Sequence, residues 1–201
     1  DEAASNYTTT PAQGSFTVDP TAAYFHYTPN ETIGGVEFGY VPDAGDVPIV
    51  ADLSSTILSR PIEVSKFGLI YAGAQKNIGP AGLAIVIIRD DLLGRARPQV
   101  PSVMNYARHV ECDSMYNTPA TFMIWVAGLV FQYVKKEGGV AEMARRNAAK
   151  SRLLYDVLDG SALYTNRIQP ASRSRMNVPF FLREPRLESR FFDGARRRGL
   201  L

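Results

Sequence analysis

Short apolar runs separated by turn-rich segments dominate the first half of the chain. Runs at 47–52 (VPIVAD), 67–74 (FGLIYAGA) and 83–89 (LAIVIIR) have the length and the β-branched content of buried strands. Two shorter strands are predicted at 22–27 and 35–40, around the turn-like TPNETIG. The IGPAG segment between the last two long runs has turn chemistry, which favours antiparallel pairing there.

Helical periodicity replaces the strand pattern in the second half. Helices are predicted at 90–96, 119–136, 140–158 and 186–198, with a further strand at 174–182. The second helix ends in Lys135-Lys136, and Gly138-Gly139 follow as its stop. The third is amphipathic and is stopped by Gly160.

Strands that alternate with helices predict an α/β fold with a mostly parallel sheet and one antiparallel strand. Between about 145 and 160 the residue pattern changes, from apolar strands and helices to a later strand and an Arg-rich tail. We therefore expect one large domain over 1–145 and the start of a small α+β domain over 146–201. At roughly 150 residues per domain, 201 residues correspond to about 1.3 domains.

Composition and charge exclude several classes of protein. The chain has 22 basic and 20 acidic residues, a net charge of +2, which argues against a polybasic nucleic-acid binder. Hydrophobic residues make up 45%, too many for a disordered chain. The single cysteine, Cys112, cannot form an intrachain disulfide and favours a reducing compartment.

No targeting or membrane-spanning pattern is visible. The chain opens without a basic and apolar leader, and its longest apolar run, 122–131 (FMIWVAGLVF), is shorter than the roughly 18 to 20 residues that cross a bilayer. This run predicts a buried helix or a subunit interface. We expect a cytoplasmic protein.

Histidine and cysteine give little support for a metal or thiol site. His26 has no second ligand nearby, and His109 with Cys112 offers only two of the four ligands of a closed zinc site. His109 could act as a base for Cys112, but a passive small residue is the favoured interpretation of this cysteine. No GxSxG, GxGxxG or GxxxxGK[ST] motif occurs.

Lys76, within AGAQKNIGPAG, is the first candidate for chemistry. It follows an apolar strand and has small neighbours, which leave space for a flat, bulky group. In a partly dry site its amine would be a usable nucleophile toward a carbonyl. The alternative, a loop lysine that reaches water, is about as well supported by this feature alone.

Asp52 ends another apolar run and strengthens the case for a ligand site. Ligands of open α/β sheets bind beyond the carboxyl ends of strands, where an acid and a lysine can face one molecule. An aldehyde cofactor with a pyridine ring needs this pair. The alternative is that Asp52 caps the following SSTILS turn. The clusters 30–32 and 117–119 could bind phosphate oxygens, or could act only as caps.

Several segments of the chain resemble a known family. ADLSSTILSRPIEVSKFGLIYAGAQKNIGPAGLAIVIIRDDLLG (51–94) is similar to phosphoserine aminotransferases of the class-V, fold-type I group. HYTPNETIGGVEF, SMYNTPATF, KEGGVAEM and SRMNVPF also resemble that family, in the same order. The resemblance covers nearly the whole chain, although His109 and Cys112 lie between the matched segments.

The resemblance implies a pyridoxal 5'-phosphate enzyme with the aspartate-aminotransferase-like fold, working as a homodimer. It would exchange the amino group between L-glutamate and 3-phosphohydroxypyruvate, in L-serine biosynthesis. Bacterial members also use a related phosphorylated keto acid of vitamin B6 synthesis.

The resemblance also implies a role for each matched residue. Lys76 would form the Schiff base and move the proton between the substrate and the cofactor. Asp52 would hold the ring nitrogen protonated, Thr32 would bind near the phenolic oxygen, and Gln75 would contact the phosphate. Asn117 and Thr118 would reach the phosphate in the neighbouring subunit. No metal is implied.

The sequence departs from the family at both ends, where relatives continue into substrate-binding segments. We therefore expect an excerpt of the enzyme with weak activity or none. Trp125 is expected to pack in the core, and the arginines at 196–198 are expected to form a solvated helix face. Gly34 stands where relatives often carry a larger polar residue. Two alternatives stay open: an inactive structural fragment, and a related aminotransferase with another small substrate.

Overall fold

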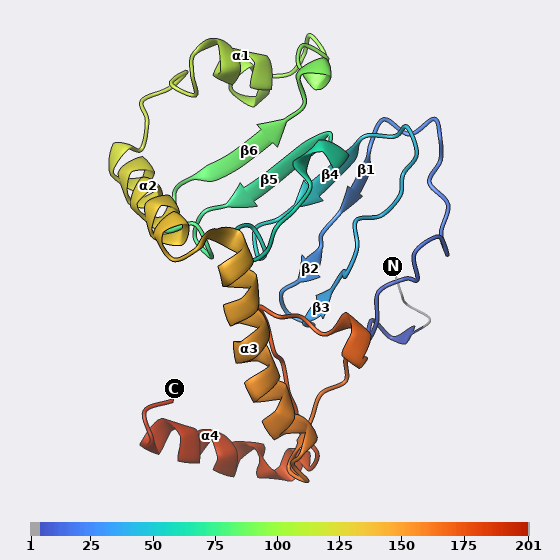
Figure 1. The fold of residues 1–201 in the computed structure, drawn as a ribbon, viewed down its shortest axis with the longest axis vertical. Coiled ribbons are helices and arrows are strands. Elements are labelled where there is room, and N and C mark those ends of the chain that lie inside the picture. Colours follow the sequence, from blue (N-terminus) through green and yellow to red (C-terminus); the bar gives the residue numbers. More distant parts are fainter. Residues whose placement is uncertain (1–4, 201) are drawn as a thin grey trace.

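A computed structural model of the chain describes residues 5–200 and contains a four-stranded mixed sheet (Figure 1). Its strand order is β1 (Phe25–Tyr27), β4 (Ile49–Asp52), β5 (Leu69–Gly73) and β6 (Ala84–Ile88). The first three are parallel, and β6 pairs antiparallel with β5. This arrangement confirms the predicted sheet and the predicted turn at IGPAG.

The two faces of the sheet differ in burial because successive side chains point to opposite sides. Ala51, Ile70 and Ala72 are 0%, 1% and 0% exposed, and they pack on one face against loop residues and Ala127. Tyr71, from the other face, is only half-buried. The core therefore lies on one side of the sheet.

Two small hairpins lie outside this sheet. The first pairs β2 (Asn30–Glu31) with β3 (Val36–Glu37), and the second pairs β7 (Tyr164–Thr165) with β8 (Phe181–Leu182). An isolated bridge joins Val36 to Arg173, so the late part of the chain returns to the first hairpin.

Four α-helices complete the described structure. They are α1 (Tyr106–Glu111), α2 (Thr121–Lys136), α3 (Gly139–Asp159) and α4 (Glu188–Arg197), and short 3-10 turns span Val64–Lys66, Asp90–Leu92, Ser102–Met104, Pro170–Ser172 and Pro185–Leu187. The last three α-helices confirm the predicted ones to within two or three residues. Gly138 has the left-handed φ of 105° expected of a glycine stop.

Several predicted elements are shorter than expected, and the strands predicted at 22–27 and 35–40 form only over Phe25–Tyr27 and Val36–Glu37. The helix predicted at 90–96 is only a 3-10 turn, because Leu93 is extended and Gly94 is left-handed with φ of 75°. Of the strand predicted at 174–182 only β8 forms. Its first part is a turn, in which Ser174 Oγ accepts hydrogen bonds from the backbone N–H groups of Met176 and Asn177 at 3.0 Å.

Helix α2 shows that the prediction for Trp125 is wrong. Trp125 is 59% exposed, and Phe122, Leu129 and Tyr133 are also exposed along the helix. The reason is that α2 faces the core with a small residue, Ala127, which is 3% exposed. Within residues 5–200, no helix has the length and apolarity needed to span a membrane.

Candidate functional site

The topology brings three predicted site residues to one edge of the sheet. Asp52 is the last residue of β4, Lys76 follows β5 by three residues, and Thr32 directly follows β2, in the first hairpin after β1. Because β1, β4 and β5 are parallel neighbours, their carboxyl ends lie together. Residues far apart in sequence therefore meet at the carboxyl edge of the sheet.

Lys76 and Thr32 are in direct contact. The Lys76 Nζ donates a hydrogen bond to Thr32 Oγ1 at 2.9 Å. The turn that carries Lys76 closes through hydrogen bonds from Ile78 and Gly79 to the Ala74 carbonyl, and buried Ile78 anchors it. Lys76 is exposed, which agrees with the alternative of a loop lysine that reaches water.

Asp52 is half-buried, and the capping role is confirmed for one of its oxygens. Its Oδ1 accepts a hydrogen bond from the Ser54 backbone N–H at 2.9 Å. Ser54 Oγ in turn accepts from the Gly73 backbone N–H at 3.0 Å, which ties the end of β4 to the end of β5. Capping the turn and facing a ligand are thus compatible roles for this carboxylate.

Tyr71 lies beside Asp52 and His26 lies beside Tyr71, and the sequence singled out neither of them for the site. His26 Nε2 lies 3.0 Å from the Tyr71 hydroxyl. Burial and then the nearby Asp52 carboxylate raise the pKa of Tyr71 above its ordinary value. Register places Tyr71 opposite Asp52 on the next strand, a pairing that could be found only once the strands were aligned.

The remaining predicted site residues are Gln75, Asn117 and Thr118. The Gln75 side chain covers Gly73, where a Cβ atom would come within 2.5 Å of Gln75 Oε1. Asn117 and Thr118 are exposed, and the cap of α2 is Ala120, so neither is the helix cap. Among the described residues neither side chain forms a hydrogen bond to Lys76, Thr32 or Asp52.

His109 lies in α1 and Cys112 follows directly after that helix. His109 Nε2 is hydrogen-bonded to the Val103 carbonyl at 2.8 Å, and Cys112 is an exposed free thiol. The described part of the chain has no group of three or more His, Cys, Asp or Glu residues placed to hold a metal ion.

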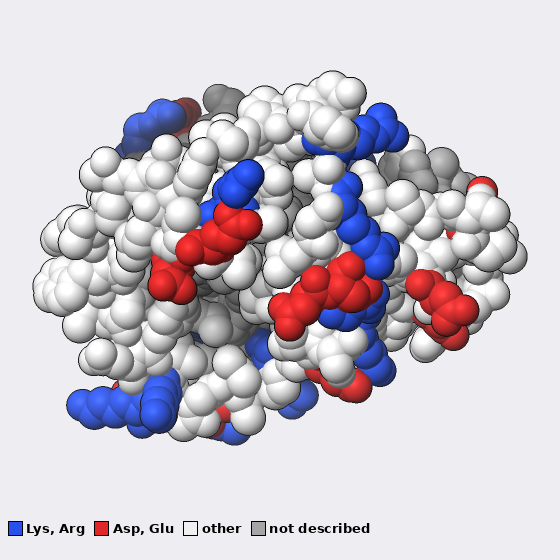
Figure 2. Space-filling view, turned by 90° about the horizontal axis from the view of Figure 1, so that it is seen from above, with Lys and Arg blue, Asp and Glu red and all other residues white. Residues whose placement is uncertain are grey.

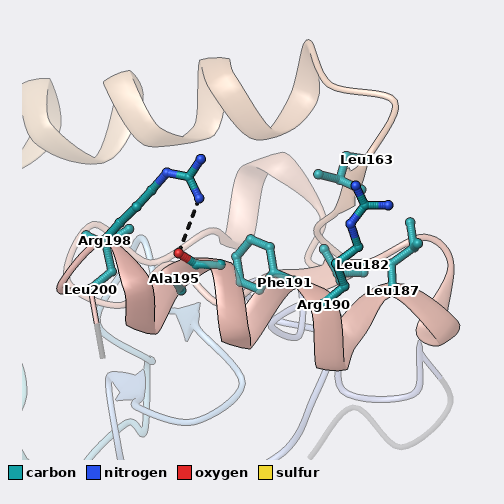
Figure 3. A pocket seen from close by; sticks show the side chains of 9 residues that line it. Leu163, Leu182, Leu187, Arg190, Phe191, Ala195, Arg198 and Leu200 are labelled. Carbon is teal, nitrogen blue, oxygen red and sulfur yellow. Dashed lines mark hydrogen bonds between the residues drawn. The ribbon is translucent and has the colours of Figure 1, made fainter.

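A groove of about 390 Å³ runs along α4, far from the sheet edge. Figure 3 shows apolar side chains along it, with Arg190 and Arg198 at its margin. Its lining lacks carboxylate, thiol or amine groups. Figure 2 shows basic and acidic side chains interspersed on the face seen from above, with wide uncharged areas. The sheet edge therefore remains the candidate site.

Comparisons with known proteins identify the family of the chain. A family model described as aminotransferase class-V matches residues 3–195. Curated phosphoserine aminotransferases from Pseudomonas aeruginosa and Azotobacter vinelandii are 57% and 56% identical to the chain over 196 residues, covering 98% of it and 54% of each relative. The chain thus spans about half the length of the curated relatives it matches.

Solved structures give the same result. The phosphoserine aminotransferase from Bacillus circulans subsp. alkalophilus aligns with a TM-score of 0.95 at 40% identity, over 98% of this chain and 55% of that one. The pyridoxal-phosphate-bound phosphoserine aminotransferase from Trichomonas vaginalis aligns with a TM-score of 0.90 at 40% identity, over 98% and 56%. Both likenesses confirm the predicted aspartate-aminotransferase-like fold.

Proposed function

Because this chain belongs to the class-V aminotransferase family, we propose that it is the lysine-bearing part of an enzyme that transfers an amino group between L-glutamate and 3-phosphohydroxypyruvate. The products would be 2-oxoglutarate and O-phospho-L-serine, in L-serine biosynthesis. One observation carries the proposal: the Lys76 amine contacts Thr32 at the edge where Asp52 ends the neighbouring strand. The identities above 50% to phosphoserine aminotransferases support this substrate pair.

The side chains at this edge fit pyridoxal 5'-phosphate by their chemistry. When bound, this cofactor supplies an aldehyde and an electron-withdrawing pyridinium ring. Lys76 would hold the aldehyde and move the proton at the substrate Cα. Asp52 would hold the proton on the ring nitrogen, and Thr32 would donate to the phenolic oxygen.

The proposed site also includes residues that would contact the phosphate of the cofactor. Gln75 would bind the phosphate on its own subunit, and Asn117 with Thr118 would reach the cofactor of a second copy in a homodimer. Their exposure, and the lack of contacts to Lys76 within the described chain, support a role between subunits. The exposed apolar side chains of α2 support the homodimer itself.

The domain division and the compartment complete the proposal. We propose a large domain over 1–145 and the start of a small domain over 146–201, with the boundary inside α3. The single cysteine favours a reducing compartment, and we propose the cytoplasm.

Trapping of the cofactor tests the role of Lys76. The chain is mixed with pyridoxal phosphate, reduced with borohydride, digested and analysed by mass spectrometry. We expect the label on Lys76, its loss in Lys76→Ala, and no change in Lys66→Ala, which removes an exposed lysine outside the site. A colourless chain without a label on Lys76 would instead favour the inactive structural fragment.

Turnover identifies the substrate. We expect glutamate-dependent conversion of 3-phosphohydroxypyruvate to exceed that of unphosphorylated hydroxypyruvate, with a low rate for the 201-residue chain. Equal rates for both keto acids would favour the related aminotransferase with a different small substrate.

A further inference from the structure

A fully buried asparagine lies beside the candidate site. Asn30 is 0% exposed and stands two residues before Thr32. Its side-chain Nδ2 donates to Ser55 Oγ at 3.0 Å and to Asn177 Oδ1 at 2.8 Å. An amide nitrogen carries two hydrogens, so both donors of Asn30 are used.

The first bond ties the Thr32 segment to the Asp52 turn. Ser55 is 7% exposed, stands three residues after Asp52, and donates back to the Asn30 carbonyl at 3.1 Å. Because Asp52 Oδ1 also binds the Ser54 N–H, the residues from Asp52 to Ser55 form one hydrogen-bonded turn. Asn30 thus links the two segments that carry the hydroxyl and the carboxylate.

The second bond ties the same side chain to a segment nearly 150 residues later in the sequence. Asn177 lies on the turn closed by Ser174, and the Ser174 backbone N–H donates to the Gly35 carbonyl at 2.9 Å. The Tyr155 hydroxyl of α3 donates to the Ser174 carbonyl at 2.9 Å. Asn177 is therefore presented by a turn fixed to both α3 and the first hairpin.

Asn177 and Ser55 both favour the observed orientation of the Asn30 amide, since each presents an acceptor oxygen to Asn30 Nδ2. Asn30 Oδ1 is buried and has no hydrogen-bond partner among residues 5–200. A flipped amide would place this oxygen against Asn177 Oδ1, and two acceptors repel each other. Without the Asn177 acceptor, the Asn30 side chain keeps only its bond to Ser55.

We propose that Asn30 is a positioning residue, which fixes the spacing between Thr32 and Asp52 and is itself oriented by Asn177. The inference rests on the proposed function, in which this hydroxyl and this carboxylate bind two different positions of one rigid ring. A rigid ligand tolerates little error in such a spacing, and sites need their groups held within roughly 0.5 Å. Asn30 acts through these residues and does not touch the cofactor.

Two substitutions at Asn177 separate positioning from bulk. Asn177→Asp keeps an acceptor oxygen facing Asn30, whereas Asn177→Leu keeps the size and removes the acceptor. In a fluorescence titration with pyridoxal phosphate, we expect Asn177→Leu to raise the apparent Kd roughly tenfold, as for the loss of one buried hydrogen bond. Asn177→Asp should restore binding to near that of the unsubstituted chain.

Hydrogen exchange of the cofactor-free chain gives a second readout. We expect Asn177→Leu to increase amide exchange over 30–37, and Asn177→Asp to leave it unchanged. The matched control is Asn166→Leu, since Asn166 Nδ2 donates to the Pro179 carbonyl at 2.6 Å outside the site. This control should lower stability without changing the Kd.

A second pair of variants tests the same inference if Asn177→Leu does not fold. Ser55→Ala removes the reciprocal bond, and Ser59→Ala removes a buried hydroxyl four residues later that donates to the Thr56 carbonyl. We expect the first to weaken cofactor binding and the second to leave it unchanged. Equal effects within each pair would overturn the inference while the proposed function stands. An unsubstituted chain with no selective label on Lys76 would overturn both.

Discussion

Lys76 Nζ and Thr32 Oγ1 lie 2.9 Å apart although 44 residues separate them in sequence. The contact joins the loop after β5 to the first hairpin, across the carboxyl edge of the sheet. Because Lys76 is exposed, water competes for this bond, and its net contribution to folding stability is small. Its consequence is geometric: it holds a primary amine beside a hydroxyl.

Thr32→Val should therefore weaken the proposed site while sparing the fold. Valine keeps the shape of threonine and removes the hydroxyl that Lys76 contacts. We expect the apparent Kd for pyridoxal phosphate to rise about tenfold, with the unfolding free energy within about 0.5 kcal/mol. Thr32→Ser, which restores a hydroxyl, is the control. Identical binding by both variants would contradict the role.

The strands and helices with strong periodicity could be predicted from sequence. The β-branched run at 83–89 and the glycine stop at Gly138 depend on local sterics, which one stretch of chain already contains. The segment 174–182 could not be predicted in this way. Ser174 is bound by Gly35 and by Tyr155, and these tertiary bonds override a local preference for extended structure.

The candidate site was predictable where a residue type implies chemistry at the end of a strand. Lys76 and Asp52 met that criterion, and the structure brings Thr32 to Lys76. Asn30 and Asn177 did not, because their relation depends on a contact that only the folded chain creates. The exposure of Trp125 could not be predicted, because an apolar run does not tell which face of a helix is covered.

Glu37→Gln should destabilise the fold strongly. The Glu37 side chain is 3% exposed and binds Arg175 Nη2 at 2.5 Å and Arg60 Nη2 at 3.6 Å. Burial lowers the pKa of the Arg60 guanidinium, and the Glu37 carboxylate opposes that shift. Removing the carboxylate leaves the half-buried Arg60 and Arg175 guanidinium groups without this acidic partner, which costs about 2–3 kcal/mol. Urea unfolding measures this loss.

An exposed pair provides the control for Glu37. Glu63 lies 3.3 Å from Lys66, and both side chains are more than half exposed. Glu63→Gln should change the unfolding free energy by less than about 1 kcal/mol. A Glu37→Gln variant that is no less stable than Glu63→Gln would show that the buried network contributes nothing.

Gly35→Ala should also be strongly destabilising. Gly35 has a left-handed φ of 77°, and a Cβ atom there would lie 2.4 Å from Pro179 Cδ. We expect a loss of roughly 2–4 kcal/mol from backbone strain and overpacking together. Gly14→Ala isolates the first cause, since Gly14 has a similar φ of 79° and nothing within 4 Å of the added atom. Thermal or urea unfolding should rank Gly35→Ala as the less stable variant.

Tyr27 should make the fold sensitive to alkaline pH. Burial raises the pKa of Tyr27 from 10.0 to about 12 in the folded chain. Between these values the unfolded chain loses the phenol proton and the folded chain retains it, so stability falls as pH rises from 10 to 12. Below pH 10 both states carry the proton and this contribution is constant.

Urea unfolding at a series of pH values measures this effect. Tyr27→Phe should be less steeply destabilised than the unsubstituted chain between pH 10 and 12. Tyr24→Phe, at a residue that is 58% exposed, should keep the original slope. Parallel curves for the unsubstituted chain and Tyr27→Phe would refute the assignment.

Trp125→Glu should disrupt the proposed homodimer. Trp125 is 59% exposed and its ring lies 5.9 Å from that of Phe122, while Leu129 and Tyr133 extend the same exposed apolar surface of α2. Large aromatic side chains at the centre of an interface contribute most of its binding energy, and a buried unpaired carboxylate opposes association. We expect the dimer dissociation constant from analytical ultracentrifugation to rise at least about tenfold.

Leu153→Glu, at an α3 residue that is 71% exposed, is the matched control and should leave the dimer dissociation constant unchanged. A chain that is monomeric at every concentration tested, or equal effects of both substitutions, would reject α2 as the dimer surface.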